Sequence, residues 1–217
     1  MGSINTEPTS HLARSYAVSN VADMRTLYDD WASTYESDLA TASQDYVGPA
    51  VAARYLLQSL GSPPQIPADL SILDAGCGTG LVGAALARSG ARTVDGVDLS
   101  PGMLGVARKL GVYRTLETAD LSQRLGVGDA AYDVVVCIGT MTQCHVGPDV
   151  IGEFVRVVKA GGLVVASVLL DIWESGGYRA KVDGLVNEGK IQLLQSQVED
   201  YRRGAGAQAQ MIAFKVV

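Results

Sequence analysis

The stretch LDAGCGTG, residues 73–80, decides the fold of this chain. Five of its eight residues are Gly, Ala or Asp, so the segment carries few bulky side chains. Apolar residues precede it, and the following segment LVGAALARSG (81–90) has the composition of a helix that ends at Gly90. The pattern predicts a strand, a loop and a helix, with a loop backbone that a ligand can approach closely.

Strand and helix patterns alternate from residue 70 to the carboxyl end of the chain. The segment 101–111 begins with Pro101 and ends with Gly111, which is typical of a helix. YDVVVCIGT (132–140) is almost continuously apolar, as a strand covered on both faces requires. This alternation predicts a three-layer α/β domain.

A separate helical region precedes the Pro-rich break SPPQIPAD (62–69). We expect residues 1–15 to be disordered and residues 16–62 to form an N-terminal helical lid, with LYDDWASTYESDL (27–39) at its centre. Residues 63–217 are then expected to form the ligand-binding domain.

Charge and composition favour a small-molecule ligand. The formal net charge is −6, the sequence pI is about 4.9, and Lys and Arg form no cluster, whereas a nucleic-acid-binding face is usually basic. No apolar run reaches the roughly 18 residues that span a bilayer, so no membrane partner is expected. Three cysteines without metal-ligand spacing predict no metal site and a reducing, cytoplasmic location.

Two cofactor classes fit the glycine loop. Residues 78–83 satisfy the pattern G-x-G-x-x-G, and Asp98 lies where a ribose-binding acid is expected in a dinucleotide site. This pattern therefore favours a nicotinamide oxidoreductase as one interpretation. The second pattern is Asp74 followed by alternating glycines from Gly76 to Gly80.

The second pattern continues along the chain and resembles the motifs of class I S-adenosylmethionine-dependent methyltransferases. The matching segments span about residues 71–170, and a dehydrogenase fingerprint does not predict the later ones. They are LDAGCGTG, GVDLSPGML (96–104), TAD (118–120), YDVVVCIG (132–139) and RVVKAGGLVVAS (156–167).

A narrower resemblance is to the Williams-Beuren syndrome region methyltransferase-like protein family, because YDDWASTYESDL (28–39) is similar to its opening segment. KAGGL (159–163) departs from that family, which often has Pro here. The resemblance implies a Rossmann-like, seven-stranded, mostly parallel sheet with an antiparallel last strand. It also implies methyl transfer from S-adenosylmethionine to an O, N, S or C nucleophile of a small-molecule acceptor, leaving S-adenosylhomocysteine. The protein is expected to be a monomer or homodimer.

The resemblance also implies which residues bind the cofactor. They share positions in or beside the family motifs, and two tyrosines come from the lid. The glycine loop contributes Gly76, Cys77, Gly78 and Gly80; Asp74, through water, and the carbonyl near Ile138 accept from the ammonium; Asp98, with Leu99, binds the ribose; Met103, Asp120 and Leu121 contact adenine; Tyr28 and Tyr35 cover the methionine end.

His145 and Tyr46 are the candidate catalytic residues. The loop that follows the strand 132–140 should pass in front of the transferred methyl group, and His145 has the unperturbed pKa that suits a base at neutral pH. An ordinary loop histidine is the competing interpretation, in which case a lid tyrosine such as Tyr46 would act. A protein that binds S-adenosylmethionine without transferring its methyl group, such as a cyclase-like enzyme, is the alternative function.

Overall fold

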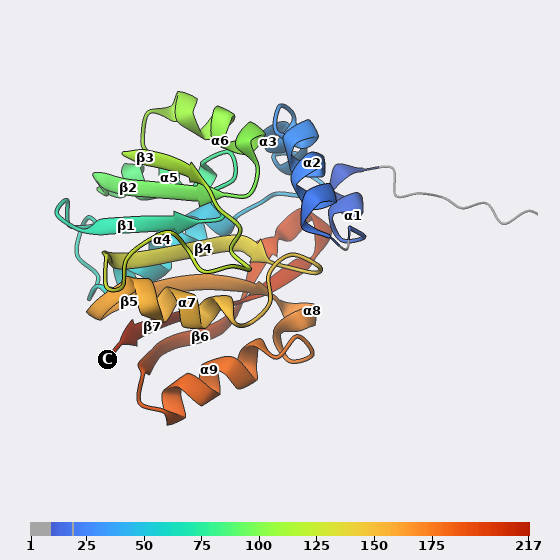
Figure 1. The fold of residues 1–217 in the computed structure, drawn as a ribbon. Coiled ribbons are helices and arrows are strands. Elements are labelled where there is room, and N and C mark those ends of the chain that lie inside the picture. The colour runs from blue at the N-terminus through green and yellow to red at the C-terminus, as the bar shows by residue number, and fades with distance from the viewer. Residues whose placement is uncertain (1–9, 19) are drawn as a thin grey trace, which may run out of the picture.

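The computed structural model describes residues 10–18 and 20–217. Its centre is a seven-stranded sheet with the order β3-β2-β1-β4-β5-β7-β6 (Figure 1). The strands are β1 (Ser71–Ala75), β2 (Thr93–Asp98), β3 (Thr115–Thr118), β4 (Tyr132–Met141), β5 (Val158–Leu169), β6 (Ile191–Arg202) and β7 (Ala207–Val216). Pairs from β3 to β5 are parallel, whereas β7 runs antiparallel to both β5 and β6. The predicted mostly parallel sheet with an antiparallel last strand is confirmed.

Helices cover both faces of this sheet. Among the described residues they are α1 (His11–Ser15), α2 (Val21–Trp31), α3 (Tyr35–Leu39), α4 (Gly48–Ser59), α5 (Leu81–Arg88), α6 (Pro101–Ala107), α7 (Val150–Val157), α8 (Leu170–Trp173) and α9 (Tyr178–Asn187), with the short 3₁₀ helices η1 (Arg108–Leu110) and η2 (Arg203–Ala205). Side chains of α4 and α5 share one apolar core with the sheet, and α7 and α9 share the other. The three-layer prediction is therefore confirmed.

The apolar run in β4 explains why the strand lies at the centre of the sheet. Residues 134–138 are all buried, and β4 pairs with β1 on one side and β5 on the other. Because side chains of a strand alternate between faces, a continuous apolar run is stable only between two helical layers. The first turn after β4 is thereby fixed at the carboxyl edge of the sheet.

Helices α1, α2 and α3 gather at the end of the sheet where the arrows of β1 and β4 point (Figure 1). Trp31 is buried together with Met103 of α6. Asp29 of α2 accepts hydrogen bonds from the Ser100 hydroxyl (2.5 Å) and the Gly102 amide (2.8 Å). A Cβ on Gly102 would lie 3.0 Å from the Asp29 Cα, so glycine allows this close approach. The N-terminal helices thus rest on the beginning of α6.

Two boundaries differ from the sequence-based expectation. Residues 1–9 of the expected disordered segment lie outside the described residues, but His11–Ser15 form α1, and His11 stacks on Trp31 with ring centroids 5.6 Å apart. Helix α4, expected in the lid, packs Ala52 and Leu56 into the same core as the sheet. Small residues on one face of α4 allow this packing, so the helical cover ends before α4.

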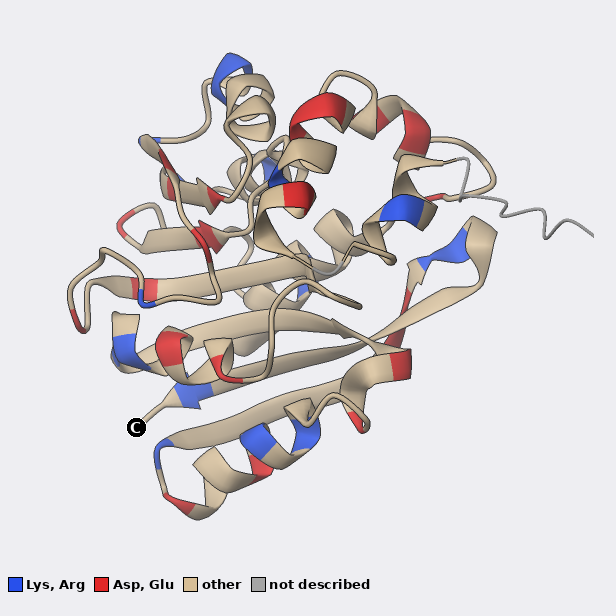
Figure 2. Ribbon diagram, turned by 45° about the vertical axis from the view of Figure 1, so that its right-hand side comes forward, with Lys and Arg blue, Asp and Glu red and all other residues tan. Residues whose placement is uncertain are grey.

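Charged residues are distributed over many elements. Figure 2 shows Lys and Arg interspersed with Asp and Glu along the ribbon. Within the described parts of the chain, no helix is long and apolar enough to cross a membrane.

Candidate active site

A cavity of about 190 Å³ lies at the carboxyl edge of the sheet, beneath the N-terminal helices. Parallel α/β sheets bind ligands at this edge. Eleven of the residues singled out from the sequence line the cavity: Tyr28, Tyr35, Gly76, Gly78, Asp98, Leu99, Met103, Asp120, Leu121, Ile138 and His145. The fold thus brings together segments that are far apart in the chain.

The glycine loop forms one wall of this cavity with a backbone that only glycine adopts easily. Gly76 has φ +77°, and a Cβ there would lie 2.0 Å from the Thr140 hydroxyl oxygen. Gly78 has φ +55°, and a Cβ there would project into open space. The loop therefore leaves room for a ligand to lie directly against the main chain.

Asp98 holds this loop in place and faces the cavity. Its Oδ2 accepts from the Gly78 amide (2.8 Å) and its Oδ1 from the Ser100 amide (2.9 Å). Ser100 is the N-cap of α6, as the sequence indicates, because its hydroxyl accepts from the Met103 amide. Burial raises the pKa of Asp98. Each carboxylate oxygen retains a lone pair that can accept from a ribose hydroxyl.

Asp74 is almost completely buried and is not part of the cavity wall. Its Oδ2 accepts from the Tyr113 hydroxyl (2.7 Å), whereas its Oδ1 has no hydrogen-bond partner among the described residues. Burial, and after it the Asp98 charge, raise the pKa of Asp74 to about 7. An unpartnered buried carboxylate oxygen is costly, so this atom is suited to accept from a bound donor such as an ammonium group or its bridging water.

Another part of the cavity wall has side chains that suit an adenine ring. Met103 and Leu121 are buried apolar side chains of this wall. Asp120 accepts from the Ser122 amide and hydroxyl through Oδ1, which leaves Oδ2 as the oxygen for an exocyclic amino group. Leu99 directly follows Asp98 in the chain and also lines the cavity.

His145 contacts Tyr28 in the wall of the cavity. The Tyr28 hydroxyl lies 2.8 Å from His145 Nε2, and His145 Nδ1 lies 2.6 Å from the Gln143 carbonyl oxygen. A carbonyl only accepts, so Nδ1 carries the proton and Nε2 accepts from Tyr28. Burial lowers the pKa of His145, so the imidazole is neutral at pH 7. The expected role of His145 toward an acceptor stays a prediction; in this structure its side chain lines the cavity and its basic nitrogen faces Tyr28.

Tyr35 and Tyr46 differ in their place relative to this cavity. Tyr35 lines the main cavity and packs against Trp31, with ring centroids 4.7 Å apart. Tyr46 lies instead in a smaller adjoining cavity, against Tyr201. Burial raises the pKa of Tyr46 well above its ordinary value, so its hydroxyl is a donor rather than a base at neutral pH.

Cys77 and Gly80 do not line the cavity in this structure, so their expected cofactor contacts stay predictions. The Cys77 sulfur lies against Gly96, where a Cβ would be 2.9 Å away, and the Cys77 amide donates to the Val97 carbonyl. Gly80 is the N-cap of α5 with φ +97°, and Leu110 occupies the space beside it. Both residues therefore support the loop from the side of β2 and η1.

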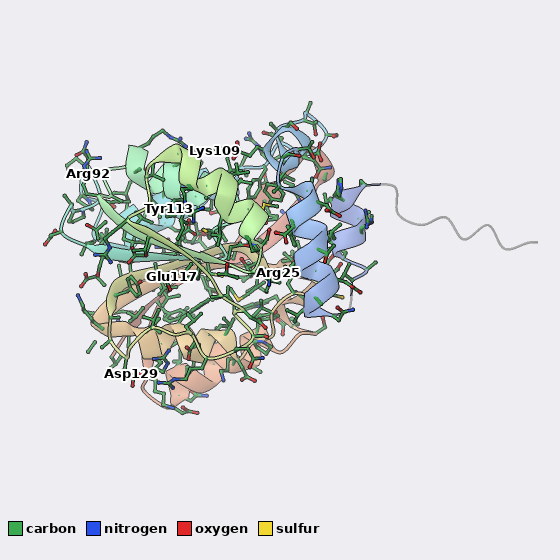
Figure 3. The ribbon with its side chains drawn as sticks, turned by 45° about the horizontal axis from the view of Figure 1, so that its top comes forward. Arg25, Arg92, Lys109, Tyr113, Glu117 and Asp129 are labelled. Carbon is green, nitrogen blue, oxygen red and sulfur yellow. The ribbon has the colours of Figure 1, made fainter. Side chains whose placement is uncertain are left out.

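Several site residues were not singled out from the sequence. Tyr113 lies beside α5 and α6 (Figure 3), and a Cβ on Gly83 would be 2.2 Å from its hydroxyl. No local motif marks this tyrosine. Other cavity residues come from the start of α2, the turn after β3, the end of β4 and the loop after β4: Asn20, Val21, Met24, Ala119, Gly139, Thr140, Cys144 and Val146. Their only sequence signal is proximity to the motifs.

Comparisons with known proteins agree with this site. A family model described as a methyltransferase domain matches residues 72–162. Methyltransferase-like protein 27 of Homo sapiens is 36% identical over 159 residues, which are 73% of this chain and 62% of the relative. Malonyl-[acyl-carrier protein] O-methyltransferase of Serratia marcescens is 35% identical over 115 residues, covering 52% of this chain and 44% of that protein. The chain thus spans less than two thirds of the length of these relatives.

A solved structure supports the fold assignment. Magnesium protoporphyrin IX methyltransferase of Synechocystis with bound S-adenosylmethionine superimposes with a TM-score of 0.63 at 20% identity, covering 93% of this chain and 99% of that one. The sheet order and the solved structure define a Rossmann-like α/β fold. The matching family model and the sequence relatives are all described as methyltransferases, so the chain is similar to the class I S-adenosylmethionine-dependent methyltransferases.

The residues present fit the cofactor of this class, S-adenosylmethionine. Gly76 and Gly78 form a wall without side chains, and Asp98 faces the cavity with free lone pairs. Asp74 Oδ1, which has no hydrogen-bond partner among the described residues, can accept from a donor. These features match a ligand with a ribose diol and an ammonium group.

The raised pKa of Asp74 predicts that cofactor affinity depends on pH. The cofactor ammonium favours ionised Asp74, so protons compete with the cofactor below a pKa of about 7. Between pH 7.5 and 6.0 we expect affinity for S-adenosylhomocysteine to fall by up to about tenfold per pH unit. Calorimetry at both pH values measures this.

Adenosine is the matched control for this measurement because it lacks the ammonium group, and its affinity should change little. The variant Asp74→Asn should bind S-adenosylhomocysteine more weakly and with a flat pH profile. Equal affinity of the parent protein at pH 7.5 and 6.0 would contradict the assignment of Asp74.

Proposed function

We propose that this chain transfers a methyl group from S-adenosylmethionine to a nucleophile of a small molecule in the cytoplasm. The observation that carries the proposal is a single cavity lined both by the candidate nucleoside-binding residues and by the Tyr28–His145 pair. The relatives named for O-methyl transfer support an oxygen nucleophile. The three free cysteines are consistent with a reducing compartment.

Each part of the cofactor has a candidate partner in the chain. Asp98 would accept from the ribose hydroxyls, Asp74 would serve the ammonium, and Met103 with Leu121 would enclose adenine. When bound, S-adenosylmethionine supplies a methyl group activated by its sulfonium. The protein's main contribution would be to hold the acceptor in line with that group and to exclude water.

The Tyr28–His145 pair provides a route for the acceptor proton. An acceptor hydroxyl that donates to the Tyr28 oxygen can lose its proton to Tyr28 while Tyr28 gives its own proton to His145 Nε2. Burial raises the pKa of Tyr28, so its hydroxyl stays neutral and conducts the proton rather than keeping the charge. The Gln143 carbonyl, which accepts from Nδ1, stabilises the resulting imidazolium.

Ligand binding and label transfer test this function in two steps. We expect calorimetry to give micromolar affinity for S-adenosylmethionine and S-adenosylhomocysteine, roughly −8 kcal/mol. NAD is the matched control for the oxidoreductase alternative and should give no heat. A result with NAD bound and neither sulfur nucleoside bound would contradict the proposal.

The second step separates a methyltransferase from a protein that only binds the cofactor. The chain is incubated with methyl-labelled S-adenosylmethionine and an extract of small metabolites. Label in a metabolite fraction, absent when the Asp98→Ala variant is used, supports transfer. Tight cofactor binding without label transfer from any extract fraction would favour the non-transferring alternative.

A further inference from the structure

A second, smaller cavity of about 20 Å³ adjoins the larger cavity described above. Tyr28, Tyr35 and Gly139 line both cavities, so the two spaces share a wall. Tyr46 and Tyr201 also line the smaller one, which is therefore rich in tyrosine rings and hydroxyls. A small chemical group that enters it would lie next to the proposed proton route.

Arg202 also lines this smaller cavity and is only 7% exposed. Its guanidinium donates to the Gln44 side-chain oxygen (3.1 Å) and to the Tyr16 hydroxyl (2.8 Å), both of which are neutral groups. Its Nε has no hydrogen-bond partner among the described residues. No carboxylate of the described chain forms an ion pair with it, whereas the neighbouring Arg203 pairs with Asp45 at 2.8 Å.

A buried guanidinium without a counter-charge is costly, and the rings of Tyr16 and Tyr201, whose centroids lie 5.7 and 5.9 Å from the Arg202 Cζ, offset only part of that cost. The hydrogen bonds to Gln44 and Tyr16 do not require a charged donor. Attachment of the N-terminal region therefore does not by itself explain a buried arginine at position 202. The free Nε–H and the remaining Nη–H groups form the planar fork that matches a carboxylate. The missing partner is therefore expected to come from a ligand.

We propose that the smaller cavity is the acceptor subsite and that it recognises a carboxylate through Arg202. This inference rests on the proposed function and adds the acceptor class: a small molecule with a nucleophilic group near Tyr28 and a carboxylate at Arg202. The limited space favours a carboxylate over a bulkier phosphate. The tyrosine rings that line the smaller cavity would contact the apolar part of the acceptor.

The experiment compares carboxylates with their amides on the complex of the protein with S-adenosylhomocysteine. The pairs are acetate with acetamide and 4-hydroxybenzoate with 4-hydroxybenzamide, titrated by calorimetry in a buffer free of carboxylate and phosphate. We expect at least one carboxylate to bind about tenfold or more tightly than its amide, because the charge pairs with Arg202. In Arg202→Gln the preference should vanish.

Arg203→Gln is the matched control, because Arg203 is adjacent and exposed and should not alter the preference. Arg202→Lys retains the positive charge and should retain part of the preference for the carboxylate. This variant keeps the test informative should Arg202→Gln fold poorly. Failure of S-adenosylhomocysteine to bind the parent protein would overturn the proposed function itself. Binding of S-adenosylhomocysteine with no carboxylate preferred over its amide, or a preference that persists in Arg202→Gln, would overturn this inference alone.

Discussion

Replacing His145 by alanine should lower methyl-transfer turnover by about 10²–10⁴-fold, the usual contribution of a positioned base. The reason is that, in the proposed proton route, His145 Nε2 receives the proton passed through Tyr28, whose hydroxyl oxygen lies 2.8 Å away. Cofactor affinity should hardly change, because the glycine loop and Asp98 hold the nucleoside. Single-turnover kinetics with the acceptor found by label transfer measure the loss.

Three comparisons separate proton transfer from simple positioning. His145→Gln can still accept from the Tyr28 hydroxyl but cannot take its proton, so it should recover little activity if proton transfer is the role. Tyr28→Phe should be similarly slow, and the double variant should be no slower than either single one, because the two residues act as a unit. Parental turnover in His145→Ala would make it an ordinary loop histidine.

The pH profile of turnover follows from the same pair. His145 acts in its neutral form, and burial lowers its pKa below the ordinary 6.5. At a cofactor concentration that stays saturating despite the pH dependence of Asp74, turnover should therefore be constant around neutral pH and decrease only as the pH falls through this lowered pKa. This decrease should be absent in His145→Gln.

The second large effect is expected for Asp98→Ala. Loss of the acceptor for two ribose hydroxyls removes charge-assisted hydrogen bonds worth about 1.5–3 kcal/mol each at most, so cofactor affinity should fall by about 10²-fold or more. Asp98 also accepts from the amides of Gly78 and Ser100, so the variant loosens the loop itself. Calorimetry with S-adenosylhomocysteine measures the sum of both effects.

A ligand without the diol separates ribose binding from loop loosening. The parent protein should bind adenosine much more tightly than 2′,3′-dideoxyadenosine, and Asp98→Ala should bind the two about equally. The melting temperature of the variant reports whether the domain remains folded. A variant that still distinguishes the two nucleosides would show that another residue recognises the ribose.

The sequence carries the information for the sheet because its elements depend on local patterns. The apolar run in β4, the Pro101 and Gly111 ends of the helical segment and the glycine loop are all readable within about ten residues. The candidate cofactor residues, which the family resemblance implies, lie in these motifs, and the carboxyl ends of parallel strands bring the motifs to one edge of the sheet. Asp98 and Met103 were found in this way, and the structure places both in the cavity wall.

Contacts between distant segments could not be predicted in the same way. Tyr28 and His145 are 117 positions apart, and Tyr113 and Asp74 are 39 apart, with no pattern in the chain that pairs them. Helix α4 was assigned to the lid because a Pro-rich break follows it, although its small residues pack against the sheet. The buried environment of Arg202 likewise exists only in the folded chain, because it is formed by segments from both ends of the sequence.

The contact of Asp29 with the beginning of α6 has a consequence for the catalytic cycle. Asp29 binds Ser100 and Gly102, and Ser100 in turn donates its amide to the proposed ribose acceptor Asp98. Any movement of α2 away from the site would break bonds at the same turn that carries the proposed ribose contact. We therefore expect substitutions that loosen this turn both to speed cofactor release and to weaken cofactor binding.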